Sequence, residues 1–346
     1  MIRKIRDISR KYALWVDYIF YLIFSPFKFK KFPINIKKIL VVEDLSIGDI
    51  LVVVPTLRAL KAKFGAQIDI KVSPNMKEVA ESLPYVNKII TNFDIDKDYD
   101  LGIILHSGSF KNSYNLLRNK VKYRIGCTKV GVLTPKGFFL NKKIMPNTKE
   151  QHKIEDNWDV IRPIKVDTQN KSLEIITDKE IDKKIISLFK QNKLNKFKVV
   201  IHPGANYKSH EWVPERYIKV IQFLIDNYDA SIIITGSNKD KNILEYILKQ
   251  FNNPILDLCG KTNIKEFFSI IKNSDLVISV DTSAMHIAAA FNKPIIAIFG
   301  DGYPKMWYPY TENKVILFKD YSTKNIYEED VIEAIQKLIK KWEYYI

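Results

Sequence analysis

The chain has 346 residues, of which 46% are hydrophobic and 27% charged, and its 55 Lys and Arg against 39 Asp and Glu give a net charge of +16. This composition excludes wholesale disorder, and the length suits two domains of about 150 residues each. The only cysteines, Cys127 and Cys259, exclude a disulfide scaffold and a four-cysteine zinc site and favour a reducing compartment. The charge is compatible with nucleic acid, an anionic membrane surface or phosphorylated substrates.

The first 38 residues are strongly basic and surround an apolar run. They hold ten basic side chains against two acidic ones, a local net charge of +8. The run from Ala13 to Phe27 contains Asp17 and is shorter than the about 20 apolar residues of a membrane-spanning helix. It also lacks a good signal-peptide cleavage site. We therefore expect residues 1–38 to lie on an anionic membrane surface; the alternative is a helix that packs on the protein's own body.

From residue 38 onward, strand and helix patterns alternate. The strands are rich in Ile and Val on both parities, which is typical of parallel strands covered by helices on both faces. In the first series we expect strands at 39–43, 69–72, 88–91, 101–105 and 123–126, and helices at 49–64 and 75–83. Residues 129–172 have no clear period, and we interpret them as irregular structure and an inter-domain connection.

A second alternating series follows the connection. We expect strands at 198–202, 231–235, 255–258, 276–280 and 294–299, and helices at 178–193, 214–228, 239–250, 263–273, 283–291 and from about 327. Two such series predict an α/β protein with two Rossmann-like domains. Because ligands of open parallel sheets bind at the carboxyl ends of the strands, the loops that follow strands are the candidate sites.

The first candidate loop follows the first strand and reads Ser46-Ile47-Gly48-Asp49. Gly48 allows a ligand to approach the backbone closely. Asp49 is a candidate general base, but an aspartate at the start of a helix is commonly its N-cap. The residues alone favour the cap.

The second candidate loop spans residues 202–212 and combines Gly204 with the donors Asn206, Lys208, Ser209 and His210. This set suits an anion. The alternative is an ordinary strand-to-helix loop in which Trp212 packs against the body and a proline stands in the first helical turn.

The third candidate loop begins at Asp281, where Thr282 and Ser283 open a helix of small residues that includes His286. Free N–H groups at a helix start form a phosphate site, and the hydroxyls add donors. The alternatives are simple capping by Thr282 and Ser283 and a packing role for His286. The combination favours phosphate binding.

Other patterns carry less weight. The acidic run 94–100 resembles a carboxylate metal site, but it precedes a strand, so a solvated turn is the better interpretation. His202 and His210 lack an evident third zinc ligand. A dinucleotide-binding glycine motif after the first strand, a phosphate-loop lysine motif and a serine nucleophile elbow are all missing from the sequence.

The three loops together resemble glycosyltransferase family 9, the heptosyltransferase family of lipopolysaccharide synthesis. The resemblance is carried by residues 39–64, 202–217 and 257–310, of which the last contains GKT, DTSAMHIAAA, PIIAIFG and WYPY in that order. It spans roughly residues 37–318 and leaves out the basic N-terminal segment.

The resemblance implies a GT-B fold, in which two Rossmann-like domains face each other across a cleft, and an inverting, metal-independent reaction. We expect a membrane-surface segment at 1–36, an acceptor domain at 37–172, a nucleotide-sugar donor domain at 173–320 and a C-terminal helix at 321–346 that could pack back on the acceptor domain.

The resemblance also assigns residues. Asp49 matches the family's proposed catalytic base, and Ser46 and Gly48 fall in the acceptor cleft. The donor and its phosphates are expected at Gly204, Asn206, Lys208, His210, Gly236, Lys261, Asp281, Thr282, Ser283, Ala284 and His286. The family usually has Gly and Pro at the positions of Ser283 and Ala284 and Lys at the position of His210, which leaves the donor's identity open; Lys208 could supply the missing charge.

The expected substrates are ADP-heptose and a lipopolysaccharide core acceptor, without a cofactor or metal, at the cytoplasmic face of the membrane. A hexose donor, a non-hydrolysing sugar-nucleotide epimerase and a basic nucleic-acid-binding protein are the alternatives. Nucleic acid is the weakest of the three partners because the basic residues form no known nucleic-acid motif. The sequence leaves the oligomeric state open.

Overall fold

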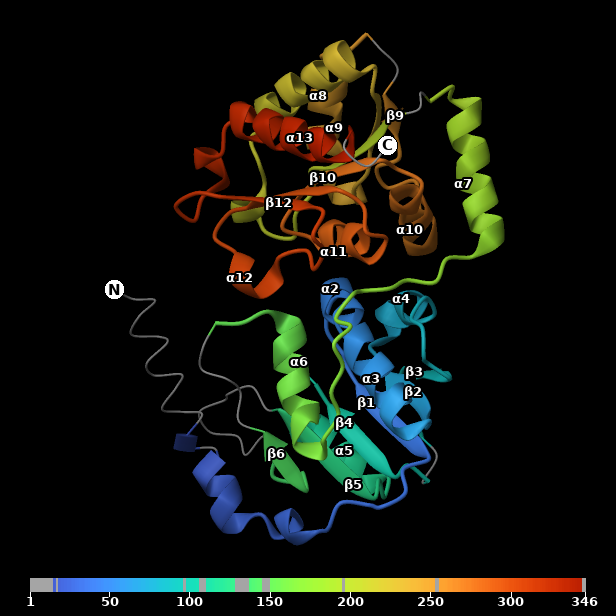
Figure 1. Ribbon diagram of the computed structural model, residues 1–346, viewed down its shortest axis with the longest axis vertical. Helices are drawn as coiled ribbons and strands as arrows, with labels where there is room; N and C mark the ends of the chain where they lie inside the picture. The colour runs from blue at the N-terminus through green and yellow to red at the C-terminus, as the bar shows by residue number, and fades with distance from the viewer. Residues whose placement is uncertain are drawn as a thin grey trace. The chain divides into compact units, whose positions relative to one another are not determined.

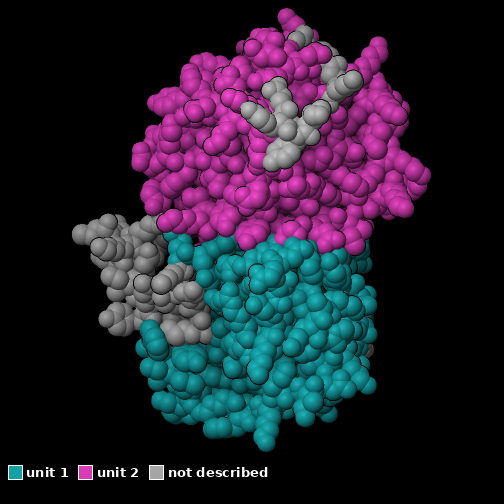
Figure 2. Space-filling model, in the orientation of Figure 1, with its two compact units in different colours: residues 1–171 teal, residues 172–346 magenta. Residues whose placement is uncertain are grey.

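The computed structural model describes residues 15–16, 18–95, 98–105, 110–127, 137–144, 150–194, 197–252 and 255–343, with side chains up to residue 341. The chain divides into two compact units, unit 1 at residues 1–171 and unit 2 at residues 172–346 (Figures 1 and 2). The expected α/β architecture with two parallel sheets is confirmed.

Unit 1 is built on a parallel sheet that has six strands within the described residues, in the order β3-β2-β1-β4-β5-β6. Its strands are β1 (Lys38–Val42), β2 (Gln67–Lys71), β3 (Lys88–Ile90), β4 (Leu101–Ile104), β5 (Tyr123–Cys127) and β6 (Lys142–Ile144). Strands β1 and β4 are central, and all of β4 and most of β1 are buried, as their apolar sequences require.

The helices of unit 1 connect and cover these strands (Figure 1). They are α2 (Ile47–Leu51), α3 (Val54–Phe64), α4 (Lys77–Ala80), α5 (Phe110–Arg118) and α6 (Lys153–Ile161), with 3₁₀ turns η1 (Pro26–Phe29), η2 (Pro74–Met76) and η3 (Arg162–Ile164). The expected single helix at 49–64 is two helices, because the chain makes a turn at Val52 and Val53 and resumes just before Pro55. Helix α3 ends at Gly65, whose φ of 60° is left-handed.

Unit 2 repeats the same topology. Its described sheet has six parallel strands in the order β12-β11-β10-β7-β8-β9. They are β7 (Lys198–His202), β8 (Ser231–Ile234), β9 (Leu256–Asp257), β10 (Leu276–Val280), β11 (Ile295–Phe299) and β12 (Lys314–Phe318). The helical elements are α7 (Lys179–Gln191), η4 (Lys208–His210), α8 (Pro214–Tyr228), η5 (Asn238–Asp240), α9 (Lys241–Leu248), α10 (Ile264–Lys272), α11 (Ser283–Ala290), α12 (Pro304–Trp307), η6 (Thr323–Asn325) and α13 (Glu328–Glu343).

The C-terminal helix α13 belongs to the core of unit 2. It packs against α8 and the strands β11 and β12, and Ala334, Ile335 and Leu338 are buried in the same apolar cluster as the sheet. Its additional packing on the acceptor domain stays a prediction.

Three described elements were not expected from the sequence. The irregular interpretation of residues 129–172 is wrong where β6 and α6 lie, and helix α5 and strand β12 were missed. Both missed strands are short or half-exposed edge strands with lysines, which weakens the alternation that identifies a strand.

The apolar N-terminal run is described in part, and residues 18–24 are helical. One side of this helix packs on unit 1: Tyr21 is 4% exposed and its hydroxyl donates to the Asn141 carbonyl at 2.9 Å, and the Ser25 hydroxyl donates to the Phe138 carbonyl at 2.7 Å. Burial raises the pKa of Tyr21 to about 12, so this donor keeps its proton. Other apolar side chains of the segment are exposed, including Trp15, Val16, Ile19, Phe20, Leu22, Ile23, Phe24 and Phe29. Among the described residues, no helix has the length and apolar character needed to cross a membrane.

Candidate functional site

The strand order reverses at the same place in each unit, between β1 and β4 in unit 1 and between β7 and β10 in unit 2. Ligands of open parallel sheets bind where neighbouring connections diverge in this way, at the carboxyl ends of the strands. Asp49 follows β1, His202 ends β7 and Asp281 follows β10. The topology therefore places the residues expected from the sequence at the two most favourable positions.

Asp49 is fixed by Ser46 in a capping box. Ser46 is the N-cap of α2, and Asp49 is the third residue of the helix. The Ser46 backbone N–H and hydroxyl donate to Asp49 Oδ2 at 3.2 and 2.7 Å, and the Asp49 N–H lies 3.5 Å from the Ser46 hydroxyl. The interpretation of Asp49 as the N-cap is therefore wrong in detail, because Ser46 occupies that position.

The capping box leaves Asp49 6% exposed, with a fixed orientation at the sheet edge, and Gly48 is buried beside it in the same short helix. A carboxylate in this position can cap the helix and also take part in chemistry.

Two further charged side chains belong to this edge, and the sequence interpretation missed them. Glu43 follows β1 directly and is fully buried, and Lys153, the first residue of α6, is 3% exposed. Burial is the main cause that raises the pKa of Glu43 to about 8, with repulsion from Asp49 adding to it and Lys153 opposing it. A glutamate at the end of an Ile- and Val-rich strand was the available signal. Nothing in the sequence connects it to a lysine 110 positions away.

In unit 2, His210 lies between two carboxylates. Its Nδ1 is 3.6 Å from Asp281 Oδ2, and its Nε2 is 2.8 Å from Asp301 Oδ1. Burial raises the pKa of Asp281 to about 6; His210 opposes the shift and Asp301 adds to it. A Cβ atom on Gly302 would lie 2.3 Å from Asp281 Oδ2, so the chain passes the carboxylate at a distance that a larger residue would not permit. Asp301 was not expected.

The start of helix α11 has the features of an anion site. Thr282 stands at the N-cap position but makes no side-chain cap bond, and its hydroxyl lies 3.0 Å from the hydroxyl of Ser279 instead. The simple-capping alternative is therefore wrong for Thr282. Thr282 and Ser283 are half-buried, whereas Ala284 and His286 are buried, and the His286 ring packs edge-on against Trp307 with centroids 6.0 Å apart. The packing alternative thus holds for His286.

The loop after β7 contributes exposed donors. Asn206 and Lys208 are exposed, and Lys208 opens the turn η4. A Cβ atom on Gly204 would lie 2.3 Å from the Asp240 carboxylate, which itself accepts the backbone N–H of Ser237 at 2.7 Å. The glycine therefore allows this loop to pack tightly against the loop after β8.

Three neighbouring side chains have roles of their own. Burial lowers the pKa of His202 to about 4, and its Nδ1 lies 3.0 Å from the Thr235 hydroxyl, so His202 is neutral and adds no charge to an anion site. Trp212 is 1% exposed and its Nε1 donates to the Ile326 carbonyl at 2.8 Å, which confirms the packing role considered for it.

Gly236 and Lys261 complete the expected donor side. Gly236 follows β8 and is half-buried. Lys261 is exposed, and its ammonium bonds the carbonyl and the carboxylate of Asp257 in its own turn. Lys261 thus has a local partner that a ligand would have to replace.

Within the described part of the chain, no group of three or more His, Cys, Asp or Glu side chains is arranged to hold a metal. In the acidic run, Asp98 pairs with Lys38 at 2.8 Å, and Asp100 accepts the backbone N–H groups of Lys37 and Lys38 and pairs with Lys122 at 2.7 Å. These contacts lie at the amino end of β1, and Asp96 lies outside the described residues.

Comparison with known proteins decides the family. The sequence model of glycosyltransferase family 9 (heptosyltransferase) matches residues 95–335. The chain belongs to glycosyltransferase family 9. The matched range begins after Asp49, so the assignment of that residue rests on its own geometry.

The relatives agree with this membership. The chain is 32% identical to lipooligosaccharide heptosyltransferase 2 of Haemophilus influenzae over 120 residues, 33% of this chain and 34% of the relative. The alignment thus spans about a third of that relative's length. A glycosyltransferase family 9 structure from Veillonella parvula has a TM-score of 0.79 at 19% identity, covering 89% of this chain and 98% of that one. The structure of Escherichia coli ADP-heptose lipopolysaccharide heptosyltransferase II has a TM-score of 0.74 at 21% identity, covering 88% and 99%. These structures share the fold, which is of the GT-B type.

Proposed function

We propose that this protein is an inverting, metal-independent glycosyltransferase that transfers a heptose from ADP-heptose to a lipopolysaccharide or lipooligosaccharide core acceptor. The observation that carries the proposal is the buried Asp49 carboxylate, held by Ser46 at the carboxyl end of β1. Family membership and the names of the related heptosyltransferases support the class of reaction.

In the proposed step, Asp49 accepts the proton of an acceptor hydroxyl while the hydroxyl oxygen forms a bond to the anomeric carbon of the donor. The bond between that carbon and the phosphate oxygen breaks on the opposite face, and ADP leaves with the electron pair. A positioned general base contributes about 10²–10⁴-fold to such a reaction. The Ser46 contacts keep the carboxylate in one orientation, as proton transfer in line with attack requires.

The donor's diphosphate would lie at the start of α11. The N–H groups of its first turn carry partial positive charge, Thr282 and Ser283 add hydroxyls, and the exposed Lys208 adds a full charge. His210, when protonated, is held by Asp281 and Asp301 as a second cation. Fixed donors of this kind stabilise the charge that develops on the leaving group.

The test compares wild type with Asp49→Asn and with the matched control Asp98→Asn, which removes an exposed carboxylate paired with Lys38. With ADP-heptose and a heptose-deficient core acceptor, we expect Asp49→Asn to lower kcat about 10²–10⁴-fold while ADP affinity stays unchanged, and the control to behave as wild type. Wild-type turnover in Asp49→Asn would disprove the assignment.

The same assay separates the alternative activities. Transfer from a nucleotide-hexose donor in place of ADP-heptose would keep the mechanism and change the sugar, and conversion of a nucleotide sugar without any acceptor would indicate an epimerase. Affinity that requires only nucleic acid, and falls steeply with salt, would indicate the non-enzymatic alternative.

We also propose that the N-terminal segment places the enzyme on the cytoplasmic surface of an anionic membrane. The supporting observation is a helix fixed to unit 1 by Tyr21 and Ser25 whose other apolar side chains stay exposed, Ile23 to 63% and Phe24 to 58%. The exposed Lys30, Lys31 and Lys37 follow it closely. Exposed rings and aliphatics next to lysines suit the headgroup region of anionic lipid.

Sedimentation with lipid vesicles tests this surface. We expect wild type to bind vesicles that contain phosphatidylglycerol more strongly than neutral ones, and Ile23→Asp to weaken binding about tenfold. The matched control is Ile176→Asp, because Ile176 is 55% exposed in unit 2 and far from the segment in sequence. Equal loss in both variants, or no vesicle binding by wild type, would contradict the proposal.

A further inference from the structure

Helix α6 presents one face to the segment that carries Asp49. Asn157 is fully buried, and its side-chain N–H donates to the carbonyl of Val52, the C-cap residue of α2, at 3.3 Å. Lys153 lies one helical turn before Asn157 and therefore on the same face. The helix thus holds the end of α2 and directs a lysine toward its start.

This arrangement forms a buried charge cluster of Glu43, Asp49 and Lys153, whose side chains interact electrostatically and are at most 6% exposed. Two carboxylates that share one site do not both ionise readily, because the second charge meets both burial and repulsion. A single ammonium balances one of them. The cluster is therefore neutral when one carboxyl keeps its proton.

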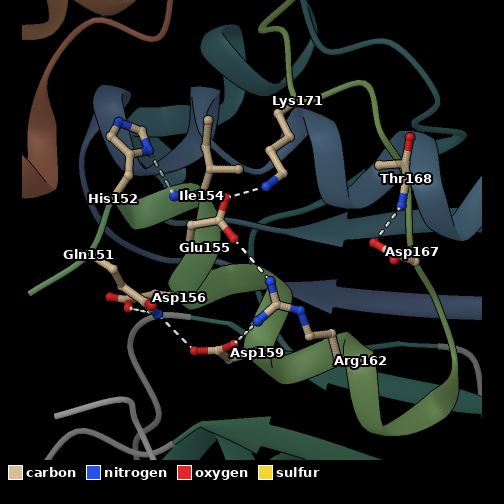
Figure 3. A network of polar contacts seen from close by, with 10 residues as sticks. All are labelled: Gln151, His152, Ile154, Glu155, Asp156, Asp159, Arg162, Asp167, Thr168 and Lys171. Atoms are coloured by element: carbon tan, nitrogen blue, oxygen red, sulfur yellow. Dashed lines mark hydrogen bonds and ion pairs between the residues drawn. The ribbon is translucent and has the colours of Figure 1, made fainter. Parts of the chain in front are cut away.

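The charges around the cluster are already matched. Lys153 Nζ lies 3.1 Å from Asp156 Oδ2, and Asp156 Oδ1 accepts an N–H of Gln151 at 2.9 Å (Figure 3). Asp44, the other carboxylate that acts on Glu43, is paired with Lys71 at 2.5 Å. Burial lowers the pKa of Lys153, whereas Asp156, Glu43 and Asp49 act to keep it charged.

We propose that Lys153 and Glu43 are positioning residues that set the pH range over which Asp49 can accept a proton, an inference that rests on the proposed role of Asp49 as the base. Lys153 keeps the Asp49 carboxylate ionised in its buried position. Glu43 holds the proton of the cluster, so that the charge of Lys153 acts on Asp49 instead of being shared. Burial and the nearby Asp49 hold the pKa of Glu43 at about 8, in keeping with this division.

The first experiment measures kcat against pH for wild type, Lys153→Met and Lys153→Arg. Without the ammonium, ionising Asp49 becomes harder, so the acid limb of the Lys153→Met profile should move about one to three pH units upward, and Lys153→Arg should restore it. Lys122→Met is the matched control, because Lys122 pairs with Asp100 at the opposite end of the sheet. An unmoved acid limb in Lys153→Met would overturn the inference.

The second experiment uses Glu43→Gln, which retains the shape of a protonated carboxyl. The acid limb should stay where it is in wild type, because Glu43 is already neutral there. A displacement as large as that of Lys153→Met would overturn its assigned role.

Thermal unfolding supplies an arm that does not depend on activity. The pKa of Glu43 is about 8 in the folded protein against an ordinary value of 4.5, so its stabilising contribution is complete below pH 4.5 and is lost as the pH rises through 8. Glu43→Gln should therefore gain melting temperature relative to wild type over this range, and the gain should level off above it. A constant difference at all pH values would contradict a buried, protonated Glu43.

A double-mutant cycle at neutral pH separates the two proposals. If Lys153 balances Asp49, then Asp49→Asn should cancel part of the melting-temperature loss caused by Lys153→Met, and additive losses would overturn the inference. Coupling in this cycle together with full turnover of Asp49→Asn would leave the cluster in place and disprove only the general base.

Discussion

The two units have the same strand order and carry different chemistry at the same topological position. Read from the first strand of each, both sheets follow the order 3-2-1-4-5-6. In unit 1, the edge beyond β1 holds the buried charges of Glu43, Asp49 and Lys153. In unit 2, the edges beyond β7 and β10 hold a half-exposed histidine, hydroxyls, an exposed lysine and a helix start.

This difference follows from what each task requires. A proton acceptor needs a controlled charge state, and burial next to a counter-charge provides that control. A diphosphate site needs donors that the ligand can reach, and a helix start with flanking hydroxyls and a lysine provides them. One topology can thus serve both tasks because the function lies in the loops.

The strongest test of this division in unit 2 is Lys208→Met. Loss of a charged donor to a phosphate should weaken ADP binding about 10–100-fold, since such hydrogen bonds contribute roughly 1.5–3 kcal/mol. Calorimetric titration with ADP measures the change, and the control is Lys249→Met, an exposed lysine at the end of α9. The acid limb of the kcat profile should stay in place; a shift like that expected for Lys153→Met would break the comparison.

A smaller effect is expected from Asp281. Its pKa of about 6 means that the side chain gains its negative charge as the pH rises through 6, next to the expected diphosphate. ADP affinity should therefore fall about fivefold across this range, the order of one unit charge repelling another at 4 Å in water, and Asp281→Asn should remove the fall. Persistence of the fall in Asp281→Asn would assign it to His210 instead.

The smallest effects come from a matched pair that removes one buried hydrogen bond from each unit. Trp212→Phe loses the bond to the Ile326 carbonyl, and Tyr21→Phe loses the bond to the Asn141 carbonyl. Each should cost about 1 kcal/mol, or about 2–4 °C in melting temperature for a unit of this size. Calorimetry measures both, and a loss in Trp212→Phe several times larger would show that α13 detaches with it.

Much of unit 2 could be predicted from its sequence. The ranges of β7, α8 and β10 agree with the expected ones, because each has a strong local signal: apolar residues on both parities in the strands, and a proline at the first helical position of α8. The candidate loops followed from these strands. By contrast, the edge strands β6 and β12 carry few buried residues and lack such a signal.

The site in unit 1 was only partly predictable. Asp49 was found through its loop and the family resemblance, and the role of Ser46 as its cap required only local geometry. Lys153 lies in a stretch without clear periodicity, and its approach to Glu43 depends on how α6 packs on α3. A contact of that kind has no signature in local sequence.

The sequence by itself determined the two Rossmann-like series, the positions of the loops and the family, because these follow from local periodicity and short motifs. The tertiary structure decided which charges share a buried site and which apolar side chains of the N-terminal helix stay exposed. Burial and electrostatic coupling are properties of the packed chain, and they turn Glu43, Asp49 and Lys153 from three separated letters into one titrating unit.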